Sequence, residues 1–162
     1  MLCRLYTVEL EVGSGRLKGK DNEALMSLLG PDFALVNPKM VCGPLHLSQA
    51  AYLADKAHDG KYNLSKDRST ELLLYLTAQR QISRAIKIAG IKSSNETVAW
   101  ASFSQIPSKL FDLVEPDESV ISHMDFDYSS LSLEREVLDK LSFDEKQKIV
   151  MTRTASLPVQ SR

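Results

Sequence analysis

Residues 71–91 read ELLLYLTAQRQISRAIKIAGI, and this stretch combines two kinds of regular structure. Residues 71–76 are mostly apolar on both faces, which predicts a central β-strand. After a short polar corner, residues 79–89 repeat their apolar side chains with the period of an amphipathic helix, and Gly90 stands where a C-terminal cap belongs. A strand followed by such a helix predicts a domain in which helices pack against a sheet.

The helix predicted at 79–89 is charged on one side only. Its buried stripe is expected at positions i, i+3, i+4 and i+7, which are Ile82, Ala85, Ile86 and Ala89. The opposite side carries the cations Arg80, Arg84 and Lys87, and the segment contains no acidic residue. Like charges at this spacing repel by roughly a few tenths of a kcal/mol. A solvated face and an anion-binding site both remain compatible with the pattern.

A second helix is predicted at 45–59, where the sequence is LHLSQAAYLADKAHD. One face of it consists of Leu47, Ala50, Ala51, Ala54 and Ala57. Because alanine is small, this face predicts close packing against a sheet or another helix. Gly60 follows as the expected C-terminal cap.

Strands are predicted on both sides of this helical centre. On the N-terminal side we expect a strand at 2–12 that ends at a turn at Gly13 and Gly15. A short helix is expected at 22–29, and two short strands are expected at 34–36 and 40–42. On the C-terminal side, residues 97–103 alternate as in a strand, and 109–114 is its expected hairpin partner.

The C-terminal part predicts two helices. The first is an amphipathic helix marked by Leu133, Val137, Leu138 and Leu141. Ser142 and Glu145 then match a capping box that starts a helix ending near Thr152. We therefore expect one α+β domain over 1–152, with a mixed sheet packed by helices in two layers, a C-terminal helical segment, and a flexible tail at 153–162.

Composition limits the classes of partner. The chain has 162 residues, enough for one domain with a real core, and a net charge of −1, which gives no general attraction to nucleic acid or membranes. Cys3 and Cys42 belong to no CxxC pair, as expected for free thiols in a reducing compartment. The N-terminus lacks a signal-peptide layout, so a soluble intracellular protein is expected.

Catalytic and metal-binding patterns are weak, so we expect neither an enzyme nor a cofactor or metal. The spacing of Gly13, Gly15 and Gly19 differs from a dinucleotide-binding loop. His46, His58 and His123 show no ligand spacing; His46 and His58 lie about 18 Å apart on one helix at a rise of 1.5 Å per residue. His58 is expected to be a hydrogen-bonded core histidine, and Asp125 with Asp127 an exposed acidic edge.

The order of several segments resembles the TPRKB-like family, the small regulatory subunits of the KEOPS (EKC) complex. These segments are Asn37-Pro38, HLSQAAYLADKA, Gly60-Lys61, STELLLYL, RQISRAIKIAGI and TVAWASF, and they cover about residues 35–105. The later SLEREVLDKLSFDE resembles the C-terminal helical segment of the family. The polar tail after Thr152 departs from the family pattern.

The resemblance implies a function. Members are α+β proteins without activity of their own that bind and stimulate the kinase-like ATPase subunit of KEOPS and, through it, join the other subunits. The complex installs threonylcarbamoyl groups on adenosine in tRNA, and members bind the 3′ CCA end of tRNA. A cytoplasmic location, also nuclear in a eukaryote, would follow.

The resemblance assigns Lys61, Arg80 and Gln81 to tRNA binding. Arg84 and Lys87 are added because the helical pattern places them beside Arg80. The loop before residue 71 adds Lys66 and Arg68. Unstacked RNA bases favour aromatic platforms, which makes Tyr62 a candidate and Tyr75 either a candidate or a core residue.

The partner surface is predicted on the C-terminal helices. Its apolar residues are Leu133, Val137, Leu138, Leu141 and Val150, which would either bind the kinase-like subunit or close the core. An alternative function is a protein-interaction adaptor with no direct RNA contact, whose cations pair with acidic groups of a partner.

Overall fold

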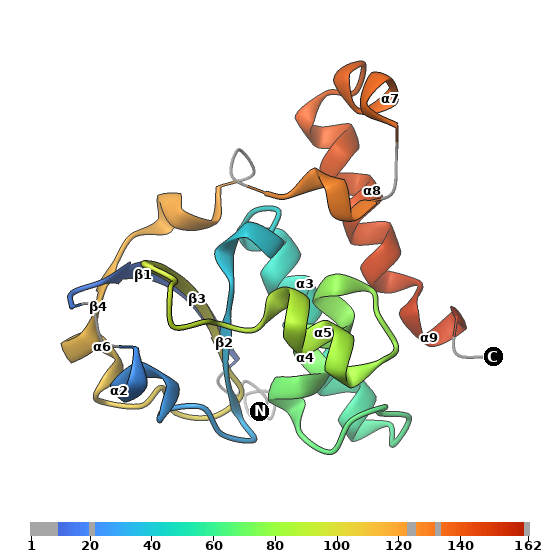
Figure 1. Cartoon of the computed structure of the whole chain (residues 1–162). Helices are drawn as coiled ribbons and strands as arrows, with labels where there is room; N and C mark the ends of the chain where they lie inside the picture. Colours follow the sequence, from blue (N-terminus) through green and yellow to red (C-terminus); the bar gives the residue numbers. More distant parts are fainter. Residues whose placement is uncertain (1–9, 20–21, 123–125, 132–133, 161–162) are drawn as a thin grey trace, which may run out of the picture.

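The structure, a computed structural model, describes residues 10–19, 22–122, 126–131 and 134–160 (Figure 1). Its described strands form one sheet in the order β2-β3-β1-β4: β1 (Glu11–Leu17), β2 (Phe33–Val36), β3 (Thr97–Ser102) and β4 (Val114–Pro116). Each pair of neighbouring strands is antiparallel. The α+β class is confirmed, whereas the predicted mixed sheet is wrong for these strands.

The turn predicted at Gly13 and Gly15 is wrong, because both glycines lie inside β1. Gly13 faces Trp100 across the sheet, and a Cβ at Gly13 would lie 2.5 Å from the indole ring. A Cβ at Gly15 would likewise meet the backbone oxygen of Glu115. Glycine inside a strand marks such close approaches as well as turns. Most of the strand predicted at 2–12 lies outside the described residues.

Two other predicted strands take different structure. Met40 is the last residue of the short helix η1 (Pro38–Met40), and residues 41–42 follow it outside any strand. The Asn37 side chain closes the first turn of η1 by accepting from the Lys39 amide at 3.2 Å. Residues 110–113 form the helical turn α6 (Leu110–Leu113), and β4 after it pairs with β1 instead of β3. These segments are too short for period alone to separate helix from strand.

Helices cover both faces of the sheet (Figure 1). On one face, α3 (Pro44–Asp59), α4 (Arg68–Thr77) and α5 (Ile82–Ala89) pack with Ala34 and Val36 of β2. On the other face, the single turns α2 (Glu23–Met26) and α6 pack with Phe33 and Leu35. The larger helical layer agrees with the predicted helices at 45–59 and 79–89. The prediction was one sheet packed by one layer of helices, and α2 with α6 adds a thin third layer on the other face of the sheet.

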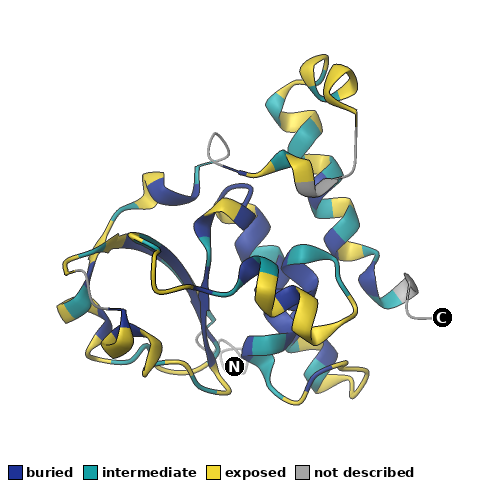
Figure 2. Ribbon diagram, viewed as in Figure 1, coloured by how far each residue is buried: buried dark blue, intermediate teal, exposed yellow. Residues whose placement is uncertain are grey.

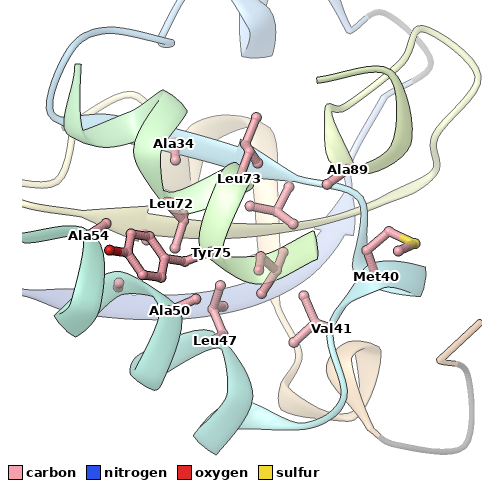
Figure 3. Packing of buried hydrophobic residues seen from close by; sticks show 14 of the residues in the cluster. Ala34, Met40, Val41, Leu47, Ala50, Ala54, Leu72, Leu73, Tyr75 and Ala89 are labelled. Atoms are coloured by element: carbon pink, nitrogen blue, oxygen red, sulfur yellow. The ribbon is translucent and has the colours of Figure 1, made fainter. Parts of the chain in front are cut away.

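The strand predicted at 71–76 is wrong, because these residues belong to α4. All six are buried, since α4 contacts α3, α5 and the sheet (Figures 2 and 3). A helix enclosed on all sides is apolar all round, and its sequence then looks the same as a central strand. Tyr75 is a core residue, and burial, with a smaller contribution from Glu71, raises its pKa to about 12.

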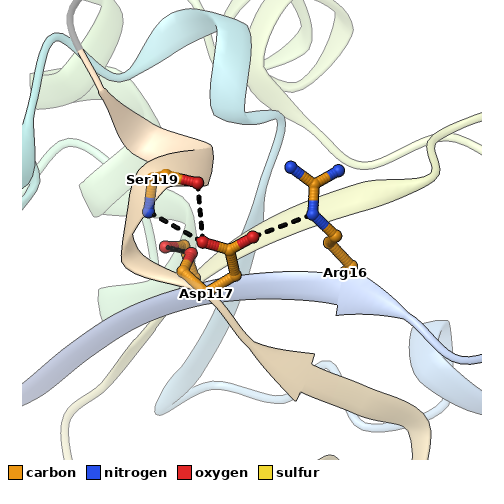
Figure 4. A network of polar contacts seen from close by, with 4 residues as sticks. Arg16, Asp117 and Ser119 are labelled. Atoms are coloured by element: carbon orange, nitrogen blue, oxygen red, sulfur yellow. Dashed lines mark hydrogen bonds and ion pairs between the residues drawn. The ribbon is translucent and has the colours of Figure 1, made fainter.

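A polar cluster fastens β4 to β1 (Figure 4). Arg16 donates from Nε to Asp117 at 2.8 Å, and the Ser119 amide donates to the same carboxylate at 3.0 Å. The hydrogen bond from the Ser119 hydroxyl, followed by those from Arg16 and from the Ser119 amide, lowers the pKa of Asp117. Asp117 thereby caps the short helix η2 (Glu118–Ile121) at the end of the sheet.

The C-terminal segment contains η4 (Tyr128–Leu131), α7 (Arg135–Asp139), α8 (Phe143–Ala155) and α9 (Leu157–Gln160). The predicted capping box is confirmed: the Ser142 hydroxyl accepts from the Glu145 amide and the Glu145 carboxylate accepts from the Ser142 amide. The flexibility predicted for residues 153–162 stays a prediction, but α8 and α9 extend through the described part of this segment. Thr154 and Leu157 are buried, and Leu157 belongs to the main core cluster.

Histidine 46 links α8 to the start of α3. Its Nδ1 accepts from the Cys42 amide at 2.9 Å, and its Nε2 lies 3.3 Å from the hydroxyl of Thr154. Burial lowers the pKa of His46 to about 4. By contrast, His58 is half-buried, and the structure gives its buried Nε2 no hydrogen-bond partner, so the expected hydrogen bond is not observed at that atom.

Candidate functional site

The sequence-predicted cations of the α5 region are open to solvent. Arg80, Arg84 and Lys87 are all exposed, and none of them takes part in an ion pair within the described ranges. We call these three residues the cationic face. The sequence pattern predicted that Arg80 lies in the N-terminal turn of this helix. In the structure α5 begins at Ile82, so Arg80 lies before the helix. The repulsion predicted between Arg80 and Arg84 within one helix therefore does not apply.

The buried stripe of α5 is narrower than predicted. Ala85 and Ala89 are fully buried, but Ile82 and Ile86 are 39% and 47% exposed. The alanines let α5 approach its neighbours closely, which leaves the isoleucines at the margin of the contact. α5 thus presents cations and branched apolar side chains to solvent together, a composition suited to binding.

The corner before α5 is held by a left-handed residue. Ala78 has φ 53°, its amide donates to the Tyr75 carbonyl at 3.3 Å, and the Gln79 amide donates to the Leu74 carbonyl at 3.0 Å. These two bonds form a Schellman motif at the end of α4. The chain then turns and leaves Arg80 and Gln81 exposed.

A second group of candidate residues lies on the loop at 60–67, which we call the Lys61 loop. Lys61 has φ 61°, and the amides of Lys61 and Tyr62 donate to the carbonyls of His58 and Ala57 at 3.2 and 3.0 Å. This is a second Schellman motif, with lysine at the position that usually holds glycine. The Tyr62 ring lies against Gly60, where a Cβ would be 2.6 Å from it, and the residue remains 51% exposed.

Arg68, also predicted to bind tRNA, is engaged within the protein. Its Nε donates to Asp55 at 2.8 Å and its guanidinium reaches Asp59 at 3.2 Å, so it joins α4 to α3. The hydrogen bond to Asp55 raises the pKa of Arg68. Its role in RNA binding stays a prediction, but its charge is already balanced by the two carboxylates.

The structure does not bring all predicted cations together. The Lys61 loop lies before the first residue of α4, and the corner with Arg80 lies after its last residue. α4 has ten residues and is therefore about 15 Å long at 1.5 Å per residue. The Lys61 loop and Arg80 thus form two separate groups at opposite ends of one helix.

Sequence reasoning missed Glu71. This carboxylate is fully buried at the start of α4 and accepts from the amides of Leu64 and Ser65 in the Lys61 loop. The signal was present, since an acid at the head of ELLLYL must find donors if the segment is buried.

A pocket of about 380 Å³ lies between α2, β2, α4 and α5. Its walls are mainly apolar and include Met26, Leu29, Leu35, Leu73, Ile86 and Ile91. Ile86 thus belongs both to this pocket and to the helix that bears the cationic face. Nothing in the sequence pattern indicated the pocket, because α5 was expected to bury Ile86.

The predicted partner surface is divided by the structure. Val137 is exposed at 45%, Leu138 and Leu141 are half-buried, and Val150 is buried against Cys42 and Phe126. Leu133 lies outside the described residues. The α7 end of this segment projects away from the sheet (Figure 1), so Val137 stands on an accessible part while Val150 closes the core.

Other chemistry has little support in the described part of the chain. Its His, Cys, Asp and Glu residues form no group of three or more suited to a metal ion. Cys42 is buried, and burial raises the pKa of its thiol. None of the described helices combines the length and apolarity needed to cross a bilayer.

Fold and surface together define a small α+β domain with exposed candidate residues on one helical layer. A family model described as kinase binding protein CGI-121 matches residues 20–149, most of the chain. The protein belongs to this family, which confirms the resemblance drawn from the sequence. A comparison with curated proteins finds no significant match.

Proposed function

We propose that this protein is a non-catalytic accessory subunit of the KEOPS complex, which modifies tRNA with threonylcarbamoyl groups. It binds and activates the kinase-like ATPase subunit and recruits tRNA through the 3′ CCA end. Membership of a kinase-binding family supports the first role. The solvent-exposed cationic face, free of ion pairs in the described structure, is the observation that carries the second.

RNA binding fits the chemistry of the two groups of residues. Guanidinium and ammonium groups bind phosphates, and a single-stranded end offers bases that stack on aromatic rings. The cationic face supplies Arg80, Arg84 and Lys87, with Gln81 beside them, and the Lys61 loop supplies Lys61 and Tyr62. The protein as a whole has a net charge of −1, so these local charges must supply the attraction.

The kinase-like subunit is proposed to contact the projecting α7–α8 segment. Val137 is its most exposed candidate, with Leu138 and Leu141 beside it. Val150 supports this surface from the core and is not proposed as a direct contact. The location remains as proposed from sequence, cytoplasmic and also nuclear in a eukaryote.

The test reverses two charges of the cationic face. Arg80→Glu with Arg84→Glu should abolish tRNA retention at moderate salt while binding of the kinase-like subunit persists. Lys109→Glu with Lys148→Glu is the matched control, because both lysines are exposed and the change in net charge is the same. Wild-type affinity should fall with salt at a log–log slope of about −0.7 per phosphate contacted. Equal tRNA binding by both variants would refute this assignment.

A protein-interaction adaptor is the second candidate, favoured by the exposure of Ile82 and Ile86 beside the cations. Apolar and cationic groups together also suit an acidic protein partner. Titration with tRNA that lacks the CCA end separates the two functions. An adaptor would bind both RNAs weakly and equally, whereas the proposed tRNA subunit prefers the intact end.

A further inference from the structure

Glu71 is a buried carboxylate whose partners all come from one loop. The residue is fully buried in the first part of α4. Its Oε2 accepts from the Leu64 amide at 3.0 Å, and its Oε1 accepts from the Ser65 amide at 2.7 Å. The Ser65 hydroxyl lies 2.8 Å from Oε1 and can donate to it as well.

Such an arrangement is costly unless the donors are held in place. A buried carboxylate loses its hydration and needs charge-assisted hydrogen bonds to replace it. The ion pairs of the described residues leave Glu71 without a cation, so backbone and hydroxyl donors carry this burden. Breaking the contacts between Glu71 and the loop would leave a charge unpaired in the interior, which strongly favours the observed loop conformation.

The loop that Glu71 holds is the loop that carries Lys61 and Tyr62. On one side, the Schellman motif at the end of α3 fixes these two residues through the carbonyls of Ala57 and His58. On the other side, Glu71 fixes the chain at Leu64 and Ser65. Only Asn63 lies between the two anchors, and its side-chain amide donates to the Ser65 carbonyl at 2.7 Å.

We propose that Glu71 is a positioning residue for RNA, which presents Lys61 and Tyr62 to the single-stranded 3′ end of tRNA. The proposal rests on the tRNA-binding function proposed above. A loop ordered before binding avoids the entropy cost of ordering it on the RNA. The Tyr62 ring, supported by Gly60 and half exposed, is then a ready platform for one base.

The test uses the full chain and a tRNA transcript with and without its CCA end. Glu71→Gln keeps the shape of the side chain but replaces one acceptor with an amide group that faces the loop donors. Preference for the intact CCA end should fall about tenfold, on the order expected when a stacked base is lost. Binding of the kinase-like subunit should stay within twofold, and the Leu64 and Ser65 amides should exchange hydrogen faster.

A double-mutant cycle separates positioning from general stability. Tyr62→Ala should weaken CCA-dependent binding in the wild-type protein but have little further effect in Glu71→Gln, because the ring is already misplaced. Additive effects, or an unchanged CCA preference in Glu71→Gln, would overturn the role proposed for Glu71 but leave the proposed tRNA-binding function untouched. If Lys61→Ala with Tyr62→Ala leaves CCA preference intact, the RNA role of the loop fails together with the inference.

Ser65→Ala provides a milder variant if Glu71→Gln does not fold. It removes the hydroxyl near Oε1 and leaves both backbone donors in place. A smaller loss of CCA preference, about two- to threefold, is expected on removal of one hydrogen bond to a charged group. Preference within error of the wild type would then count against Glu71 as a positioning residue.

Discussion

Lys61 offers a direct test of whether the protein gives up stability to place this side chain. Its φ of 61° is left-handed, a conformation that costs a side chain with a Cβ about 1–2 kcal/mol. Glycine would remove that cost but would lose about 0.5–1 kcal/mol more conformational freedom on folding. Lys61→Gly should therefore raise the free energy of unfolding by roughly 0.5–1 kcal/mol.

Ala78 provides a matched control, because it has the same backbone conformation, φ 53°, in the same kind of motif. Ala78→Gly should stabilise the protein by a similar amount. For a chain of this length, either change should raise Tm by about 1–4 °C. Urea denaturation and thermal melting both measure the effect, provided that unfolding is reversible.

RNA affinity distinguishes the two glycine variants. Lys61→Gly should be more stable yet bind CCA-ended tRNA more weakly, whereas Ala78→Gly should gain stability and keep its affinity. If Lys61→Gly is less stable than the wild type while Ala78→Gly is more stable, the left-handed conformation of Lys61 does not cost the free energy assigned to it. Unchanged RNA affinity in Lys61→Gly would remove Lys61 from the binding surface.

The pH dependence of stability and the packing of α3 give two further predictions. The pKa of His46 falls from 6.5 to about 4 on folding, so its stabilising contribution is complete above pH 6.5 and is lost as pH falls toward 4; the loss is on the order of 2–3 kcal/mol. Unfolding measured against pH should be flatter in this window for His46→Gln than for the wild type, and parallel curves would contradict the assignment. Ala54→Leu should destabilise the protein by about 1–3 kcal/mol, because Ala54 is fully buried where α3 packs against its neighbours. Lys56→Leu, at an exposed site on the same helix, should change stability little, and equal losses would refute the packing argument.

Local patterns predicted α3 and α5 because each of these two helices buries one face. The alanine face of α3 and the cations of α5 follow the helical period, and both helices occur where that period predicts them. The capping box at Ser142 is equally local, since both of its partners lie within four residues. Chemistry contained in a few neighbouring residues can be read from the sequence.

The failures involve burial by distant segments. Residues 71–76 were taken for a strand because α3, α5 and the sheet enclose them, and full enclosure removes the period that distinguishes a helix. Gly13 is a strand residue because Trp100, far away in the sequence, lies over it. For the same reason the burial of Leu157 was not predicted, because it packs in the main core with residues far away in the sequence.

The candidate site was predictable in its charges but not in its geometry. The cations of the candidate site were predicted from the sequence. Their surroundings were not, since the sequence could not show that Arg68 is paired with Asp55 and Asp59 while the cationic face is exposed. Nor could it show that α4, a helix about 15 Å long, lies between the Lys61 loop and Arg80. Because the two groups lie at opposite ends of α4, an RNA that uses both is expected to place different nucleotides on each.

This separation assigns different physical tasks to the two groups. The cationic face consists of exposed side chains that form no ion pair with the described part of the chain, so it can attract a phosphate backbone in many orientations and should respond strongly to salt. The Lys61 loop is fixed by a Schellman motif and by Glu71, so it can favour one geometry of a terminal base. Attraction and end recognition would therefore be lost independently: charge reversal on α5 should weaken binding of tRNA with or without CCA, whereas loss of Glu71 should reduce only the difference between them.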